Sequence, residues 1–149
     1  MGIEIVPVGD KAGLKQFIEL PFSLYREYPH WVPPLRIAVK DLLNREKHPF
    51  YANAEMELYL ALQDGKVAGR IAAVLDKAHN RFHEEKAGFF GFYESTNDPK
   101  VAEALLSQAR KWVKGKGAEV MRGPVNPSTN YECGMLIDAF ESDPMVMMT

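Results

Sequence analysis

The chain is most constrained by the strand–helix–strand pattern between Gly88 and Gly123. Its middle, residues 98–117, opens with Asp98 and Pro99, carries apolar residues at helical spacing, and closes in a segment rich in Lys and Gly. These are typical start and stop signals of a helix. Apolar runs on either side, residues 87–94 and 118–125, predict strands. Because a helix that crosses between two strands of one sheet normally makes them parallel, this stretch predicts a parallel strand pair.

A second strong pattern lies just before it. Residues 56–76 form two apolar, partly alternating runs around Asp64 and Gly65, the dipeptide that favours a tight hairpin turn. This stretch predicts an antiparallel pair. Elsewhere the patterns predict a strand at 3–8, a helix from Asp10 that Pro21 breaks or kinks, a Pro-rich loop at 29–36, a helix within 35–48 and a polar connector at 77–86.

Together these elements predict one α/β domain over residues 1–149, with a mixed sheet and helices on both faces. The length of 149 residues suits a single domain with a substantial core. The formal net charge of −2 gives no electrostatic reason to expect a nucleic acid or an anionic membrane as partner. No apolar run is long enough to span a bilayer, and the N-terminus does not resemble a secretory signal. The one cysteine fits a reducing cytoplasm, which is the expected localisation.

This order of elements resembles the GNAT superfamily of acyl-CoA N-acyltransferases, from Ile3 to about Asn126. The family's loop after the corresponding strand has the pattern Q/R-x-x-G-x-G/A and holds the CoA pyrophosphate. Aligned on the paired leucines of the helix, that pattern falls on Asn97, Lys100 and Ala102, and only Ala102 matches. The resemblance implies acetyl-CoA or another acyl-CoA as co-substrate, and no metal. The candidate cofactor-binding residues are Phe92, Tyr93, Asn97, Lys100, Val101 and Ala102.

The departure from the family pattern leaves two interpretations of the loop. Helix N-termini attract anions whatever their side chains, and the Lys100 ammonium could meet a phosphate. However, Asp98 adds a negative charge and Pro99 lacks an N–H donor, so the segment could equally be an ordinary helix cap.

The C-terminal part, residues 123–149, resembles the corresponding stretch of longer, uncharacterised bacterial GNAT-like proteins, where more chain follows. The apolar run Met145–Met148 then stands almost at the end of the sequence. We expect from this that the domain could be incomplete at its C-terminus, with a second copy of the chain supplying the missing strand as a homodimer.

Two residues are the catalytic candidates that the resemblance implies. Glu94 ends a strand from which some GNAT enzymes take a general base, with Glu57 on the neighbouring hairpin as an alternative. Tyr131 is the nearest match to the family's general acid. Both could instead be ordinary strand and loop residues. Cys133 has no histidine nearby in sequence, which favours a buried, unreactive thiol.

The substrate candidates come from two polar or aromatic segments. Family members use the region after the first strand to hold the acceptor, and residues 126–134 form a polar loop at the edge of the sheet where ligands bind. The candidates are Trp31, Tyr51, Asn126, Ser128 and Asn130.

His79 and His83 have a spacing that could hold zinc on a helix, but they lie in a predicted connector and lack a metalloprotease pattern, so no metal site is predicted.

The sequence thus predicts an acyl-CoA-dependent N-acyltransferase that acts on a small amine. The alternative is a GNAT-like module that has lost catalysis and binds a small molecule or a partner chain.

Overall fold

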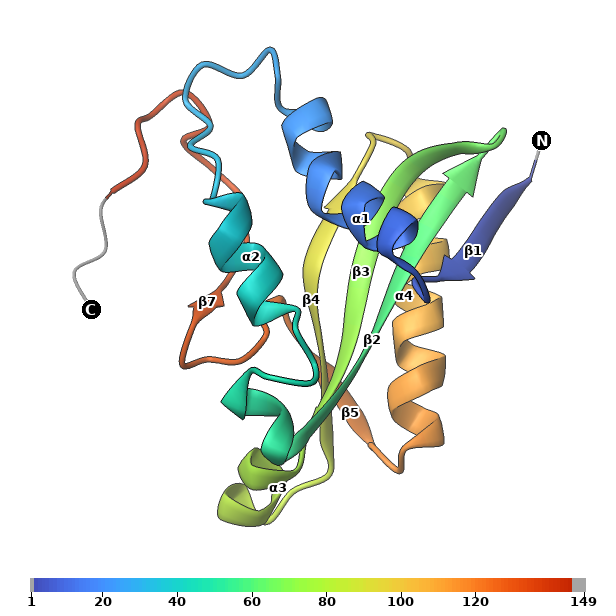
Figure 1. Cartoon of the computed structure of the whole chain (residues 1–149), viewed down its shortest axis with the longest axis vertical. Helices are drawn as coiled ribbons and strands as arrows, with labels where there is room; N and C mark the ends of the chain where they lie inside the picture. The colour runs from blue at the N-terminus through green and yellow to red at the C-terminus, as the bar shows by residue number, and fades with distance from the viewer. Residues whose placement is uncertain (1, 146–149) are drawn as a thin grey trace.

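The computed structural model describes residues 2–145 and is built around one five-stranded sheet (Figure 1). The strands lie in the order β1-β2-β3-β4-β5. All neighbours are antiparallel except β4 and β5, which are parallel, as the sequence predicted. Their bounds are β1 (Ile3–Pro7), β2 (Ala54–Gln63), β3 (Lys66–Asp76), β4 (Ala87–Ser95) and β5 (Val120–Arg122). The predicted hairpin is confirmed, and both of its turn residues, Asp64 and Gly65, have positive φ.

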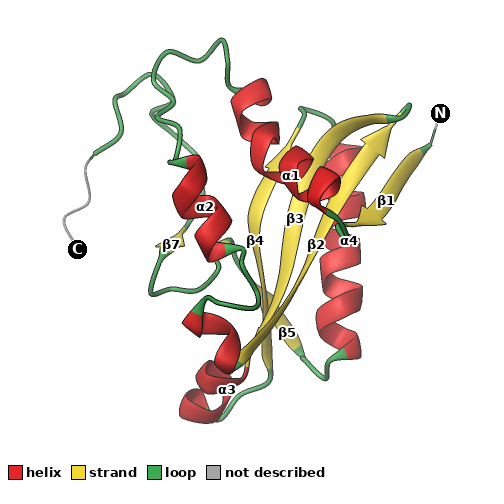
Figure 2. Cartoon of the chain, in the orientation of Figure 1, coloured by secondary structure: helices red, strands yellow, loops and turns green. Residues whose placement is uncertain are grey.

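Helices cover both faces of the sheet, which confirms the mixed α/β architecture (Figure 2). One core lies between the sheet and α1, with α2 at its edge, and includes Phe17, Leu58 and Phe92. The other lies between the sheet and α4 and includes Ile71 and Leu105. The helical segments are α1 (Lys11–Leu24), α2 (Arg36–Leu42), the 3-10 helix η1 (Pro49–Ala52), α3 (Lys77–His83) and α4 (Pro99–Gly115).

Helix α4 follows its sequence signals closely. The Asp98 side chain caps it by accepting from the Lys100 N–H at 2.9 Å, and Pro99 takes the first helical position. The buried stripe of α4 consists of Val101, Leu105, Ala109 and Val113. Burial of four such side chains against β3 and β4 is what stabilises this crossover helix.

Of the two predicted effects of Pro21 on α1, a break or a kink, the break is wrong, because the helix continues to Leu24. A proline leaves the carbonyl four residues earlier without its helical donor. Here that carbonyl belongs to Phe17, and it accepts a hydrogen bond at 2.6 Å from Nη1 of Arg70, a residue of β3. A tertiary contact thus replaces the missing backbone bond, which the local sequence could not indicate.

Three further elements differ from the prediction. The connector after β3 is the helix α3, begun by the Asp76 side chain, which accepts from the His79 N–H at 3.0 Å. The helix predicted within 35–48 is only the seven-residue α2. The last strand ends at Arg122 rather than 125, because Pro124 has no N–H for the ladder. The chain then forms a two-stranded ribbon of β6 (Val125–Asn126) and β7 (Glu132–Cys133), within the segment predicted as a loop.

Within residues 2–145, no helix is long and apolar enough to cross a membrane, and no three potential ligand side chains converge as a metal site would need. The apolar run Met145–Met148, from which we expected an incomplete domain, lies outside the described residues except for Met145. Completion of the sheet by a second copy stays a prediction.

Candidate active site at the open half of β4

The strand β4 changes its surroundings halfway along. Its first part, Ala87–Phe89, pairs with β5, and we call this the paired half. The rest, 90–95, has no ladder partner in β5, and we call this the open half. At the start of the open half, Phe92 has a φ of 49° and the register with β3 shifts, which marks a bulge. Strand β4 therefore bends close to the position where its pairing with β5 ends.

The segment after β5 crosses close to this bulge. A Cβ placed on Gly91 would lie 1.5 Å from the carbonyl oxygen of Val125, so only glycine allows this approach. The side chain of Asn126 then takes over part of the missing ladder, because its Oδ1 accepts from the Phe92 N–H at 2.6 Å. Beyond Asn126 the edge of β4 lines a cleft.

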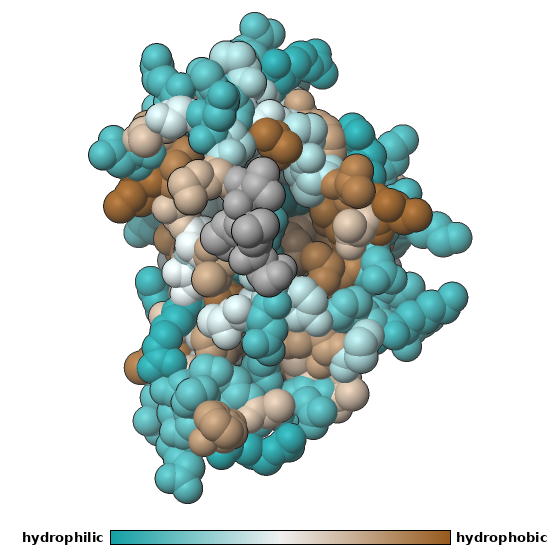
Figure 3. All heavy atoms as spheres, turned by 90° about the vertical axis from the view of Figure 1, so that its left-hand side faces the viewer, coloured by the Kyte–Doolittle hydropathy of each residue, from teal (hydrophilic) through white to brown (hydrophobic). Residues whose placement is uncertain are grey.

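The cleft has a volume of about 940 Å³. Its walls come from the connection between α1 and α2, the end of β4 with the loop that follows, and the chain after β7. Both the connection and the chain after β7 expose large apolar side chains, including Val32, Leu35, Leu136 and Phe140. Figure 3 shows the side of the molecule on which the C-terminal segment runs, and apolar residues interrupt its hydrophilic surface in several places. The cleft thus has an apolar rim.

Glu94, the predicted base, lies in the wall of this cleft. Its carboxylate accepts a hydrogen bond from the hydroxyl of Tyr25, the residue that ends α1. Burial raises the pKa of Glu94 above the ordinary carboxyl value, while the Tyr25 hydrogen bond and the Arg70 charge lower it to a smaller extent. A carboxylate with a raised pKa is a stronger base in its ionised form, as proton abstraction requires.

Arg70 stands beside Glu94, because the two are cross-strand partners in β3 and β4. Its side chain is only 6% exposed, and its guanidinium lies over the Phe17 ring at 4.9 Å. Burial lowers the pKa of Arg70 to about 10, so the group remains a cation at neutral pH. Its Nε is buried without a hydrogen-bond partner among the described residues. A buried cation therefore faces the candidate base from the floor of the cleft.

Tyr25 and Arg70 were not predicted as site residues. For Arg70 a signal was present, since it is the one charged residue in the apolar run from Val67 to Leu75. Buried charges in strands are rare unless they have a partner. For Tyr25 there was no such signal, because its meeting with Glu94 joins positions 69 residues apart.

Aromatic side chains form the wall opposite Glu94. The Trp31 ring lies 5.3 Å from both Phe22 and Tyr25, and the Tyr28 ring lies 5.9 Å from Tyr25. Trp31 lines the cleft, as predicted for a substrate-binding residue, whereas Tyr51 does not. Instead, Tyr51 packs on the core and donates its hydroxyl proton to the Leu42 carbonyl at 2.6 Å.

The predicted cofactor residues fall into two groups. Phe92, Tyr93 and Asn97 line the cleft. Lys100, Val101 and Ala102 lie in the first turn of α4, where Val101 is fully buried in the core. The Asp98 carboxylate lies at this helix start. One of its oxygens accepts from the Lys100 N–H, and the other accepts from Gln63 Nε2 at 2.9 Å. These hydrogen bonds lower the pKa of Asp98, so a negative charge remains at the place expected for a phosphate.

The predicted residues of the polar loop around β6 and β7 do not all lie in the same cavity. Asn126 lines the cleft, while Ser128 and Asn130 border a second, smaller cavity of about 250 Å³ beside α3. Tyr131 packs against His48 and Phe50 at 5.7 and 6.3 Å between ring centroids and does not line the cleft. Cys133 is exposed, so its interpretation as a buried thiol is wrong. In the short strand β7 it pairs with Val125 of β6.

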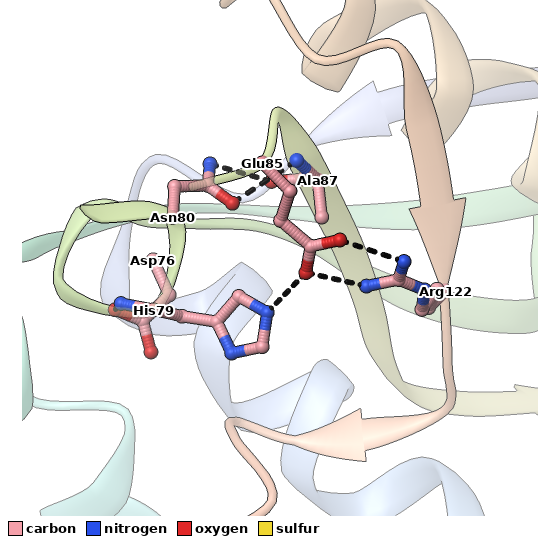
Figure 4. A network of polar contacts seen from close by, with 6 residues as sticks. All are labelled: Asp76, His79, Asn80, Glu85, Ala87 and Arg122. Atoms are coloured by element: carbon pink, nitrogen blue, oxygen red, sulfur yellow. Dashed lines mark hydrogen bonds and ion pairs between the residues drawn. The ribbon is translucent and has the colours of Figure 1, made fainter. Parts of the chain in front are cut away.

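A separate polar network holds the paired half of β4 (Figure 4). The Glu85 carboxylate accepts two hydrogen bonds from Arg122 of β5, at 2.6 and 2.8 Å, and meets the His79 ring at 2.6 Å. The Asn80 side chain bonds both the N–H and the carbonyl of Ala87. The Arg122 and His79 contacts lower the pKa of Glu85 to about 2. This network fastens α3 to the first rungs of the β4–β5 pair.

Comparison with known proteins supports the assignment of the fold. No family model matches the chain. Among curated proteins, the bacterial ceramide synthase of Caulobacter vibrioides (strain NA1000 / CB15N) is 36% identical over 147 residues, which are 98% of this chain and 38% of that protein. Protein YghO of Escherichia coli (strain K12) is 36% identical over 139 residues, or 93% of this chain and 35% of that protein. The chain therefore spans a little over a third of the length of these curated relatives.

Solved structures give the same architecture. A tandem GNAT protein from the clavulanic acid biosynthesis pathway superposes with a TM-score of 0.60 at 17% identity, over 78% of this chain and 34% of that one. An aminoglycoside acetyltransferase, meta-AAC0020, in complex with sisomicin gives 0.57 at 15% identity over 80% and 75%. AAC(6')-Iy with a CoA-containing bisubstrate analogue gives 0.54 at 16% identity over 87% and 84%.

Proposed function

We propose that this chain, which has the fold of the GNAT acetyltransferases, carries out acyl transfer from an acyl-CoA to the nitrogen of an amine. The observation that carries the proposal is the partly buried Glu94 carboxylate at the open half of β4, in the wall of a large cleft. An unpaired strand edge offers N–H and C=O groups to an extended ligand, and the pantetheine arm of CoA is a chain of amides. The thioester would then lie near Phe92–Glu94, beside the base.

The amine would enter along the aromatic wall. Trp31 and Tyr25 present ring faces and edges suited to an alkylammonium ion, and Glu94 attracts the same charge. Proton transfer to Glu94 frees the nitrogen lone pair, which attacks the thioester carbonyl. The new C–N bond forms as the C–S bond breaks, the nitrogen releases its second proton to water, and the thiolate takes a proton. Tyr25 is better placed than the predicted Tyr131 to supply that proton, because it lines the cleft.

The name of the curated relative points the same way. A ceramide is an N-acylated amino lipid, so a ceramide synthase would form the kind of amide bond proposed here. The apolar rim of the cleft suits a hydrophobic acyl chain or amine. Because the chain spans 38% of that relative, the activity of the relative passes to this chain only as a proposal.

The second candidate function, a non-catalytic binding module, has an observation of its own in its favour. Asn126 already occupies the Phe92 N–H, and the ionised Asp98 already caps α4. Both groups stand where a thioester carbonyl and a pyrophosphate would bind, so a ligand other than acyl-CoA could fill the rest of the cleft.

Thermal unfolding with acetyl-CoA and with longer acyl-CoAs tests the proposal. A ligand at 100 times its Kd stabilises the native state by about 2.7 kcal/mol, which is a measurable rise in Tm. We expect that Lys100→Glu abolishes the shift and that Lys111→Glu, an exposed change further along α4, preserves it. Absence of any shift in a cooperatively unfolding sample contradicts the acyltransferase and leaves the binding module. Where binding occurs, an assay of CoA release with alkylamines then tests transfer itself.

A further inference from the structure

Arg70 joins two features that are far apart in the sequence. Its Nη1 donates to the Phe17 carbonyl, the one that Pro21 leaves without a helical donor. Its other neighbour is Glu94, directly across the β3–β4 ladder. The helix that Arg70 completes ends at Tyr25, whose hydroxyl donates to Glu94. Arg70 therefore lies opposite the candidate base on the neighbouring strand, and it is hydrogen-bonded to the helix that leads to the base's hydrogen-bond donor.

We propose that Arg70 is the positioning residue for Glu94, and that Pro21 makes this role obligatory by leaving the Phe17 carbonyl for Arg70 to bind. This proposal rests on the proposed role of Glu94 as the base. It adds Arg70 to the site and links Arg70 to Pro21, which the fold alone does not specify.

A purely structural role explains Arg70 poorly. A buried cation is costly, and an apolar residue of similar volume in its place is often neutral or stabilising. The cost is visible here, since one guanidinium nitrogen is buried without a partner among the described residues. A helix with alanine in place of Pro21 would need no outside donor for Phe17. Pro21 and Arg70 together thus join α1 to β3 by a hydrogen bond that a helix without proline, packed on an apolar strand, would lack.

The charge on Arg70 has a direct consequence for the base. Tyr25 from α1 and Arg70 from β3 are the titratable groups that face Glu94, while His30 and Asp143 pair with each other at 2.7 Å in the outer wall of the cleft. Arg70 opposes the rise in pKa that burial imposes on Glu94. It therefore keeps a larger share of Glu94 ionised near neutral pH, where a base must accept a proton.

The first test is a double-mutant cycle between positions 21 and 70, measured by urea unfolding. In the native chain, Arg70→Met leaves the Phe17 carbonyl buried without a donor. With Pro21→Ala, the new N–H satisfies that carbonyl. We expect Arg70→Met to lower the folding equilibrium constant about tenfold more in the native background than in the Pro21→Ala background. The effect of Arg70 on Glu94 is common to both backgrounds and cancels. If the effects of Arg70→Met on the folding equilibrium constant in the two backgrounds agree within about twofold, the proposed link between Pro21 and Arg70 is overturned.

The second test reads Glu94 directly, by ¹³C NMR titration of its side-chain carboxyl. Arg70→Met should raise the pKa of Glu94 in both backgrounds, and Arg70→Lys, which keeps a charge, should raise it less. The double variant, Pro21→Ala with Arg70→Met, has its carbonyl satisfied and so keeps the test possible if Arg70→Met alone does not fold. An unchanged Glu94 pKa in that double variant overturns the positioning role.

Neither measurement uses acyl-CoA. If both give the expected result while no acyl-CoA binds, the link between Pro21, Arg70 and Glu94 stands and the proposed function fails.

Discussion

The two halves of β4 belong to one strand but have opposite surroundings. The paired half pairs with β5 along its length and with β3 at Phe89, and it is fixed by the Glu85–Arg122 ion pair. The open half keeps only β3, bends at Phe92, and borders a cleft with a partly buried carboxylate and a buried cation. A strand that is fully paired can be held by ladder bonds and apolar packing. Where pairing stops, buried polar groups have to be satisfied by side chains, and the same groups become available for chemistry.

The largest expected effect comes from the open half. Glu94→Gln removes the proposed base and should lower the rate of acyl transfer about 10²–10⁴-fold, measured as CoA release. Acyl-CoA binding, followed by thermal shift, should persist. Glu57→Gln changes the alternative glutamate on β2, which pairs with Arg45 at 3.7 Å and does not line the cleft. A loss of activity in Glu57→Gln with none in Glu94→Gln would move the base to β2.

The same substitution should change the pH dependence of stability. The folded-state pKa of Glu94 is raised, so between its ordinary and its folded value the native state binds more protons than the unfolded state. Stability therefore falls as pH rises through that window, and Glu94 weakens the fold above it. Glu94→Gln should make urea unfolding midpoints flatter with pH and higher near neutrality. A midpoint that drops at neutral pH in Glu94→Gln argues against this environment for the carboxyl.

The next effect tests how closely the chain approaches the bulge. Gly91→Ala would place a Cβ 1.5 Å from the Val125 carbonyl oxygen, a backbone atom that cannot simply rotate away. We expect a loss of about 3 kcal/mol in the free energy of unfolding, together with a weaker response to acyl-CoA. Gly115→Ala at the end of α4 is the control, because its Cβ would meet open space. Equal stability of the two variants would show that Val125 does not lie against the open half.

The paired half should respond to the same kind of change more mildly. A Cβ on Gly88 would lie 2.4 Å from the Val113 Cβ of α4, so Gly88→Ala must push this side chain and its helix outward. The expected cost is about 1–2 kcal/mol in unfolding free energy, with acyl-CoA binding unaffected. Val113→Gly introduced with it should return part of the stability, because it removes the Cβ that the new methyl group would meet. If the loss of unfolding free energy in the double variant equals the sum of the losses in the two single variants, the contact with residue 113 is not the reason why position 88 requires glycine.

The smallest effect concerns the ion pair of the paired half. Arg122→Met removes the cation that holds the pKa of Glu85 near 2. A depressed carboxyl pKa contributes stability above its ordinary value of 4.5, and that contribution disappears as pH falls towards 2. We expect a slight loss of thermal stability at neutral pH, none at the acidic end, and less at high salt because the pair is exposed. A loss independent of both pH and salt would mean that Arg122 acts by packing.

Much of the site could be anticipated from local pattern. Glu94 was predicted as a base because the family resemblance assigns one to the strand that it ends, and Trp31 as a substrate contact because it is aromatic and lies in a Pro-rich loop after the first strand. Both line the cleft, and their roles stay predictions. Asp98 was weighed correctly as a cap, since capping depends on three neighbouring residues. Tyr51 lies away from the cleft although it is also aromatic, because nothing local distinguishes a ring that faces a cleft from one that packs on the core.

The sequence by itself determined the order of the five strands of the main sheet with helices α1, α2 and α4, the hairpin at Asp64-Gly65, the buried stripe of α4 and the parallel direction of β4 and β5. All of these depend on periodicity, turn chemistry and caps, which act over a few residues. Only the tertiary structure decided that α1 passes through Pro21 and that Tyr25 and Arg70 meet at Glu94. These outcomes depend on donors and charges brought from distant parts of the chain, and a contact of that kind has no signature until the chain has folded.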